Sequence, residues 1–96
     1  MSGENIVILD FSKADSLVQV HDLLKQALGF PEYYGGNWDA LSDCLGDFCS
    51  DGERHEIELR GFYEMEIGLR SECAPMLTVF ADAQEEWGNI EFTVVS

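Results

Sequence analysis

A single two-layer α/β domain is predicted by three features of the sequence. The chain has 96 residues, the size of one small domain, so the whole of residues 1–96 is expected to fold together. Strand-like and helix-like segments follow one another in the order β, α, α, β, α, α, β. The segments between the strands are long enough for helical crossovers, which favours parallel strands.

The first part of the chain predicts a strand and then a helix. Residues 5–11 are almost continuously apolar, which is typical of a strand covered on both sides or lying centrally in a parallel sheet. Ser16 and Gln19 resemble a capping box, and apolar residues recur at helical spacing until Gly29. A helix is therefore expected over residues 17–28.

A second helix is expected to begin near Trp38, because Asn37 before it is a favourable N-cap. Its buried face is predicted from the i, i+3, i+4, i+7 spacing of Leu41, Cys44, Leu45 and Phe48. The opposite face then carries acids at a spacing of four residues: Asp39, Asp43 and Asp47.

The remaining elements are predicted from alternation and from helix boundary signals. Residues 56–60 alternate between charged and apolar, as in a half-solvated strand, and residues 62–70 indicate a short or irregular helix. Pro75 and Gly88 bound a helix of about twelve residues. Residues 90–94 alternate again, so two of the three strands alternate and one face of the sheet is expected to meet water.

The charge and the cysteines exclude several classes of protein. Nineteen acids against five bases give a net charge of −14, which opposes binding to nucleic acid and to anionic membranes. The longest aliphatic stretch, residues 6–9, is far shorter than the about 20 residues of a membrane span, and the acidic start does not resemble a signal peptide. Three cysteines without a C-x-x-C pair fit reduced thiols, so the cytoplasm is the expected location.

The row of acids has two interpretations. Like charges at i, i+4 destabilise a helix by about 0.2–0.5 kcal/mol per pair, so the row needs a compensating reason. It is either a solvated face of an acidic protein or a surface that binds a basic partner. The nearby aromatic residues Tyr33, Tyr34 and Trp38 favour binding, although they fit a core position equally well.

Neither catalysis nor metal binding is indicated. No serine or cysteine nucleophile can be placed beside a base, and His21 is interpreted as a structural or exposed histidine. The acids lack the spacing of a calcium loop and the cysteines lack that of a zinc site. We therefore expect no enzyme activity, no cofactor, no metal and no small-molecule substrate.

Residues 30–45, FPEYYGGNWDALSDCL, resemble the central motif of the barstar family, intracellular protein inhibitors of barnase-type secreted bacterial ribonucleases. Weaker similarity in register covers most of the chain. The resemblance implies a three-stranded parallel sheet packed with about four helices. It also implies a 1:1 complex with a basic, extracellular-type ribonuclease that prefers guanylyl sites.

The resemblance further implies which residues bind the partner. In the family the second helix enters the ribonuclease active site, and its carboxylates occupy places that RNA phosphates would take; by position these are Asp39 and Asp43. The other implied contacts are Tyr33, Tyr34, Gly35, Asn37, Trp38, Ser42, Gly46, Asp47, Phe48 and, on the last helix, Asp82.

Three positions depart from the family pattern. Ser42 and Phe48 stand where the family can show tryptophan, and Asp47 replaces a small residue. These changes leave the identity of the ribonuclease open. The alternative function is an immunity or regulatory module that binds a basic protein other than a ribonuclease.

Overall fold

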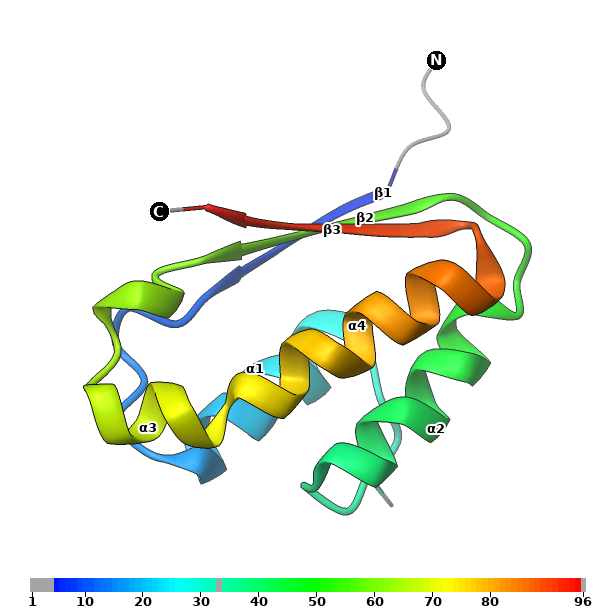
Figure 1. Ribbon diagram of the computed structural model, residues 1–96. Coiled ribbons are helices and arrows are strands. Elements are labelled where there is room, and N and C mark those ends of the chain that lie inside the picture. The colour runs from blue at the N-terminus through cyan, green and yellow to red at the C-terminus, as the bar shows by residue number, and fades with distance from the viewer. Residues whose placement is uncertain (1–4, 33, 96) are drawn as a thin grey trace.

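The computed structural model describes residues 5–32 and 34–95. The elements in chain order are β1 (Asn5–Asp10), α1 (Leu17–Leu28), α2 (Trp38–Cys49), β2 (His55–Arg60), the 3-10 turn η1 (Phe62–Glu64), α3 (Ile67–Glu72), α4 (Ala74–Trp87) and β3 (Ile90–Val95). Figure 1 shows the helices on one face of the sheet, which confirms the predicted two-layer α/β architecture.

The sheet has the strand order β1-β2-β3, and both neighbouring pairs are parallel. Val7 of β1 lies beside Ile57 of β2, which lies beside Phe92 of β3. The central strand β2 buries Ile57 and Leu59 against the helices and leaves the alternate residues partly in solvent. The prediction of parallel strands with one solvated sheet face is therefore confirmed.

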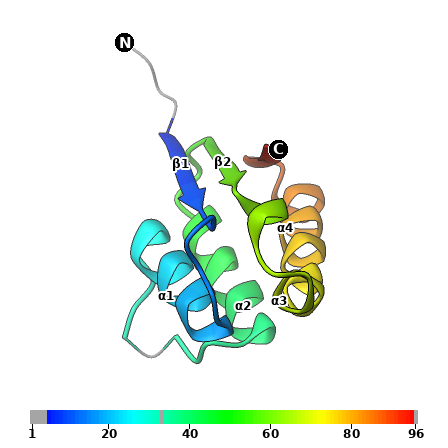
Figure 2. The same ribbon diagram turned by 90° about the vertical axis from the view of Figure 1, so that its left-hand side faces the viewer.

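The prediction for the first strand is wrong in one respect, because β1 is neither central nor covered on both sides. It forms one edge of the sheet, which Figure 2 shows from the side, and Ile6 and Ile8 are 58% and 52% exposed. Leu9 alone in this strand is fully buried among the residues whose burial is described. An aliphatic run predicts a strand, but it does not show on how many sides the strand is covered.

The segment predicted as a short or irregular helix is divided into η1 and α3. Gly61 precedes η1 with φ +72°, and a Cβ there would lie 2.5 Å from the Ser12 nitrogen, so a larger residue does not fit. Extended backbone at Met65 ends η1, and the Glu66 carboxylate then caps α3 by accepting from the N–H groups of Gly68 and Leu69.

The core lies between the sheet and the helices. Its fully buried side chains include Phe11, Leu24, Leu41, Leu45 and Phe80. Within residues 5–32 and 34–95, no helix combines the length and the apolar character that a membrane crossing needs.

Candidate partner-binding site

The start of α2 is fixed by its local sequence, as predicted. Gly36 has φ +68°, a left-handed conformation that favours glycine, and Asn37 is extended. The Asn37 side-chain oxygen accepts a hydrogen bond from the Ala40 N–H at 2.7 Å. This cap sets Trp38 as the first helical residue and so determines which side chains face outward.

One side of α2 carries an exposed row of carboxylates, Asp39, Asp43 and Asp47, here named the acidic row. The opposite side buries Leu41, Cys44, Leu45 and Cys49 in the core. Within the described part of the chain, no ion pair involves a member of the acidic row. The row is therefore available to cations from outside the chain.

The aromatic residues beside the acidic row are partly core and partly surface. Tyr34 and Trp38 are half-buried and lie against His21, which is only 7% exposed. The Tyr34 hydroxyl oxygen lies 2.6 Å from His21 Nδ1, and the Trp38 and His21 ring centroids are 4.4 Å apart. Through His21, α1 therefore contacts both the loop before α2 and the first residue of α2.

The pKa shifts of His21 and Tyr34 agree with a pair in which both side chains are neutral. Burial lowers the pKa of His21, although nearby Asp22 opposes this effect, and burial raises the pKa of Tyr34. We therefore assign the Tyr34 hydroxyl as the donor and the unprotonated Nδ1 of His21 as the acceptor. His21 was expected to be structural or exposed, and the structure shows the structural role.

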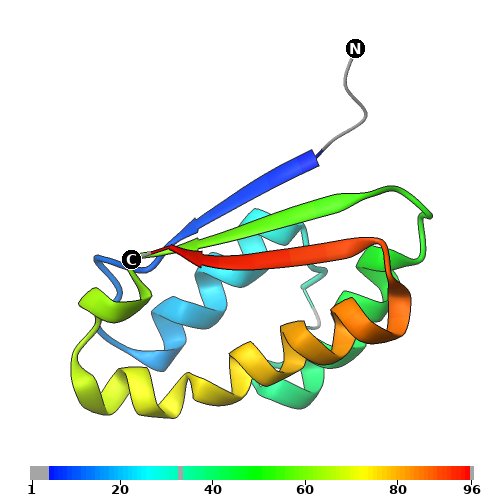
Figure 3. The same cartoon turned by 45° about the horizontal axis from the view of Figure 1, so that its top comes forward.

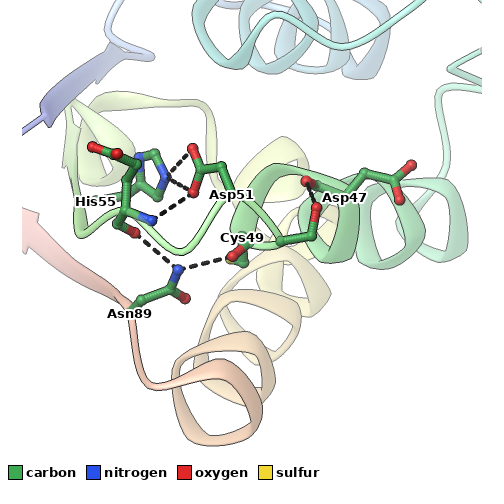
Figure 4. A network of polar contacts seen from close by, with 7 residues as sticks. Asp47, Cys49, Asp51, His55 and Asn89 are labelled. Carbon is green, nitrogen blue, oxygen red and sulfur yellow. Dashed lines mark hydrogen bonds and ion pairs between the residues drawn. The ribbon is translucent and has the colours of Figure 1, made fainter.

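The end of α2 is joined to the sheet by polar contacts that the sequence did not predict. Asn89 Nδ2 donates to the carbonyls of Cys49 and Glu53, each at 2.8 Å, and Figure 4 shows Asn89 beside Cys49 at the end of α2. His55 is 5% exposed, and its Nε2 lies 3.0 Å from an Asp51 carboxylate oxygen. The Glu53 N–H and the His55 ring lower the pKa of Asp51.

This second polar cluster also positions Phe48. The Phe48 and His55 ring centroids are 4.2 Å apart, and Phe48 is half-buried. A hollow of about 200 Å³ lies beside Phe48 and Asp47, with Gly29, Phe30 and Pro31 on its other side. Asp47 therefore gives this hollow a carboxylate, a group that attracts cations.

The remaining predicted contact residues lie in different surroundings. Gly35, Asn37 and Ser42 are exposed, and Asp82 is exposed on α4, the helix that packs against α2 in Figure 3. Gly46 is half-buried, and a Cβ there would lie 3.5 Å from the Trp87 ring, an ordinary van der Waals contact, so this position of α2 faces α4. Tyr33 lies outside the described residues.

The buried thiols do not provide a nucleophile. Burial, together with the charges of Asp47 and Asp43, raises the pKa of Cys44, and burial raises the pKa of Cys49 and of Cys73 to about 11. All three thiols are buried and free. Across residues 5–32 and 34–95, no three His, Cys, Asp or Glu side chains are grouped as a metal site.

Comparison of the sequence with known proteins finds a family and a relative that cover most of the chain. A model of the family described as Barstar (barnase inhibitor) matches residues 4–96. A protein of Bacillus subtilis (strain 168), named "Putative ribonuclease inhibitor YrdF", is 35% identical over 89 residues. That alignment covers 93% of this chain and 94% of the relative.

Proposed function

Because the chain belongs to the barstar family, we propose that it is a ribonuclease inhibitor that binds a secreted bacterial ribonuclease and blocks its active site. The observation that carries the mechanism is the acidic row, whose carboxylates are exposed and unpaired within the described residues. The family is one of inhibitors, so the chain is not an enzyme.

The geometry of α2 supports a mechanism in which carboxylates replace RNA phosphates. A ribonuclease cleft must hold anionic phosphate, so its walls carry cationic groups. Successive acids of the row are separated by about 6 Å along the helix axis. We infer that Asp39 and Asp43 pair with cations of the cleft, while Asp47 extends the same charged surface.

Both ends of α2 are held before any partner binds, which supports tight binding. The Asn37 cap and the contact between His21 and Tyr34 hold the first turn, and Asn89 holds the last. A preorganised surface loses less conformational entropy on association than a mobile one. We infer that Tyr34, Trp38 and Tyr33 form the apolar part of the interface around the acids.

We place the inhibitor in the cytoplasm and expect a 1:1 complex with a guanylyl-preferring ribonuclease. Three free thiols fit a reducing compartment, in which an inhibitor protects the cell that makes the ribonuclease. The high acidity of the chain fits a basic partner, because opposite net charges accelerate the encounter.

An inhibition assay tests the proposal. A panel of guanylyl-preferring bacterial ribonucleases, including the one encoded by the same organism, is titrated with the native chain, with Asp43→Asn and with Asp15→Asn. Asp15 is an exposed acid before α1 and provides a control with the same loss of charge. We expect inhibition by the native chain and by Asp15→Asn, and much weaker inhibition by Asp43→Asn. Absence of inhibition across the panel at micromolar protein contradicts the proposal.

A second candidate function follows from the positions that depart from the family pattern. Asp47 is exposed and lengthens the row of acids, while Phe48 packs against His55. These features would suit a basic partner other than a ribonuclease. Affinity capture from the native cell distinguishes the two functions: a basic protein without ribonuclease activity, captured by the native chain but not by Asp43→Asn, supports this second one.

A further inference from the structure

The hollow beside Phe48 is built from the ends of two helices. Leu28 and the C-cap residue Gly29 come from the end of α1. Asp47 and Phe48 come from the last turn of α2. The last carbonyl groups of a helix have no partner within that helix, so a helix end of this kind carries about half a negative charge. The hollow therefore lies beside the negative ends of two helix dipoles.

Asp47 adds a full negative charge at a place where folding alone disfavours one. A carboxylate in the last turn opposes the helix dipole, and Asp43 lies one turn earlier with the same charge. The last turn of α2 contains no base, and Asp47 forms no ion pair within the part of the chain that the structure describes. Figure 4 shows the Asp47 carboxylate pointing away from Asp51 and His55. A cation from outside the chain would relieve both repulsions.

Neither the nearest helix base nor a metal ion fits this place. Lys25, the base in the last turn of α1, has its Nζ 3.4 Å from a Glu32 carboxylate oxygen and is not among the residues that line the hollow. A metal ion needs several oxygen, nitrogen or sulfur ligands. Among the described residues, no three His, Cys, Asp or Glu side chains are grouped to provide them.

The walls of the hollow favour an organic cation, and an arginine above all. Besides Asp47, the rings of Phe30, Pro31 and Phe48 line the hollow. A guanidinium group is planar and weakly hydrated, stacks on aromatic rings and pairs with a carboxylate through two hydrogen bonds. The volume of about 200 Å³ equals that of about seven water molecules at about 30 Å³ each, which is enough for the end of an arginine side chain.

We propose that this hollow receives an arginine side chain of the ribonuclease, with the guanidinium paired to Asp47 and stacked on Phe48. The inference rests on the proposed function, because it adds a contact to the same complex. Asp47 lies two helical turns from Asp39, so this contact is separate from the one at the start of α2. Asp47 thereby distinguishes ribonucleases that carry an arginine at the matching position from those that do not.

Binding to a ribonuclease that the native chain inhibits tests the pairing. Asp47→Asn keeps the shape of the side chain and removes its charge, so it should weaken binding by about tenfold or more. Asp15→Asn is the matched control, because it removes the same charge from an exposed acid before α1, and it should weaken binding much less. Thermal unfolding of the free Asp47→Asn chain should occur at the same or a higher temperature, because the acid opposes the helix dipole.

A double-mutant cycle identifies the arginine. Each exposed arginine of the ribonuclease is replaced by glutamine, and binding to the native chain and to Asp47→Asn is measured. One replacement should weaken binding to the native chain by about tenfold or more and leave binding to Asp47→Asn nearly unchanged. Equal binding by the native chain and Asp47→Asn, or coupling of Asp47 to none of the arginines, would overturn the inference and leave the proposed function intact.

A test on the free chain separates this inference from the proposed function. N-acetyl-arginine amide is added at millimolar concentration and constant ionic strength, and the amide NMR signals of Gly29 and Phe48 are followed. These signals should shift in the native chain and in Asp15→Asn, but much less in Asp47→Asn. N-acetyl-norleucine amide, which lacks the guanidinium, should not shift them. Such shifts without inhibition of any ribonuclease would refute the proposed function alone, whereas equal shifts in the native chain and Asp47→Asn, or none, would overturn the inference.

Discussion

The acidic row on α2 and the outer edge of β1 are both exposed, yet they present different chemistry. The helix offers the carboxylates of the acidic row, which form no ion pair within residues 5–32 and 34–95. The strand edge offers the aliphatic side chains of Ile6 and Ile8 and, within the described residues, backbone groups without a partner strand. Charge acts at a distance and selects basic partners, whereas a strand edge acts only in contact and selects another strand.

The largest effect is expected from Asp43→Ala, followed by Asp39→Ala. Each change leaves a cation of the ribonuclease buried without its partner, which costs about 2–5 kcal/mol of binding free energy; measurements on the barnase and barstar complex contribute to that general range. Titration calorimetry or dissociation kinetics measures the loss.

Folding provides the control for these two variants. Removing one of two neighbouring acids on a helix relieves repulsion, so thermal stability should stay level or rise slightly. If Asp43→Ala lost stability as much as it lost binding, the carboxylate would have a structural role and the assignment would be wrong.

Salt should slow association at the acidic row. Association with a basic ribonuclease should slow by about 10–1,000-fold as ionic strength rises, because the attraction is screened. Stopped-flow association across a salt series measures this change, and an on-rate independent of salt would show that the acidity serves solubility alone.

The sequence predicted most of the α2 surface because helical spacing determines which side chains share a face. Asn37, Leu41 and Asp43 occupy the positions expected from a cap and a 3.6-residue repeat. The support beneath that surface was not predictable. The contact between His21 and Tyr34 joins residues 13 apart, and Asn89 reaches Cys49 across 40 residues, so no local pattern signals either.

The position of β1 at the edge of the sheet was not predicted, for a different reason. The aliphatic run correctly indicated a strand, but the order of strands depends on how the helices pack, which periodicity does not describe. An alternating strand such as β2 signals its solvated face through its charges. β1 carries isoleucines on that face, so the sequence alone gives no sign that the face is open.

Tyr34→Phe tests whether the α2 surface depends on its buried support. Loss of the hydroxyl leaves His21 Nδ1 buried without a hydrogen bond, which should lower the free energy of unfolding by about 1–3 kcal/mol. Urea denaturation measures this change. Tyr63→Phe is the matched control, because Tyr63 is 56% exposed, and it should change stability very little. Equal stability of the two variants would contradict the role of the contact.

The buried His21 also predicts how the free energy of unfolding depends on pH. Burial lowers the pKa of His21 in the folded chain below the value near 6.5 of an unfolded histidine, so the unfolded chain binds more protons in this range. Stability should therefore be complete above about pH 6.5 and decrease as pH falls toward the folded pKa. Denaturation curves of the native chain and of His21→Phe measure the difference, and His21→Phe should lack this component.

The smallest effect is expected from Glu85→Gln combined with Glu86→Gln. Both acids are exposed near the end of α4, outside the acidic row, so they should steer the ribonuclease without holding it. The on-rate should fall by less than about tenfold, with little change in the off-rate.

Glu64→Gln with Glu72→Gln is the control pair, since it changes the net charge equally, from −14 to −12, at η1 and α3. A larger effect of the α4 pair shows that steering depends on where the acids lie, whereas equal effects show that only the total charge matters.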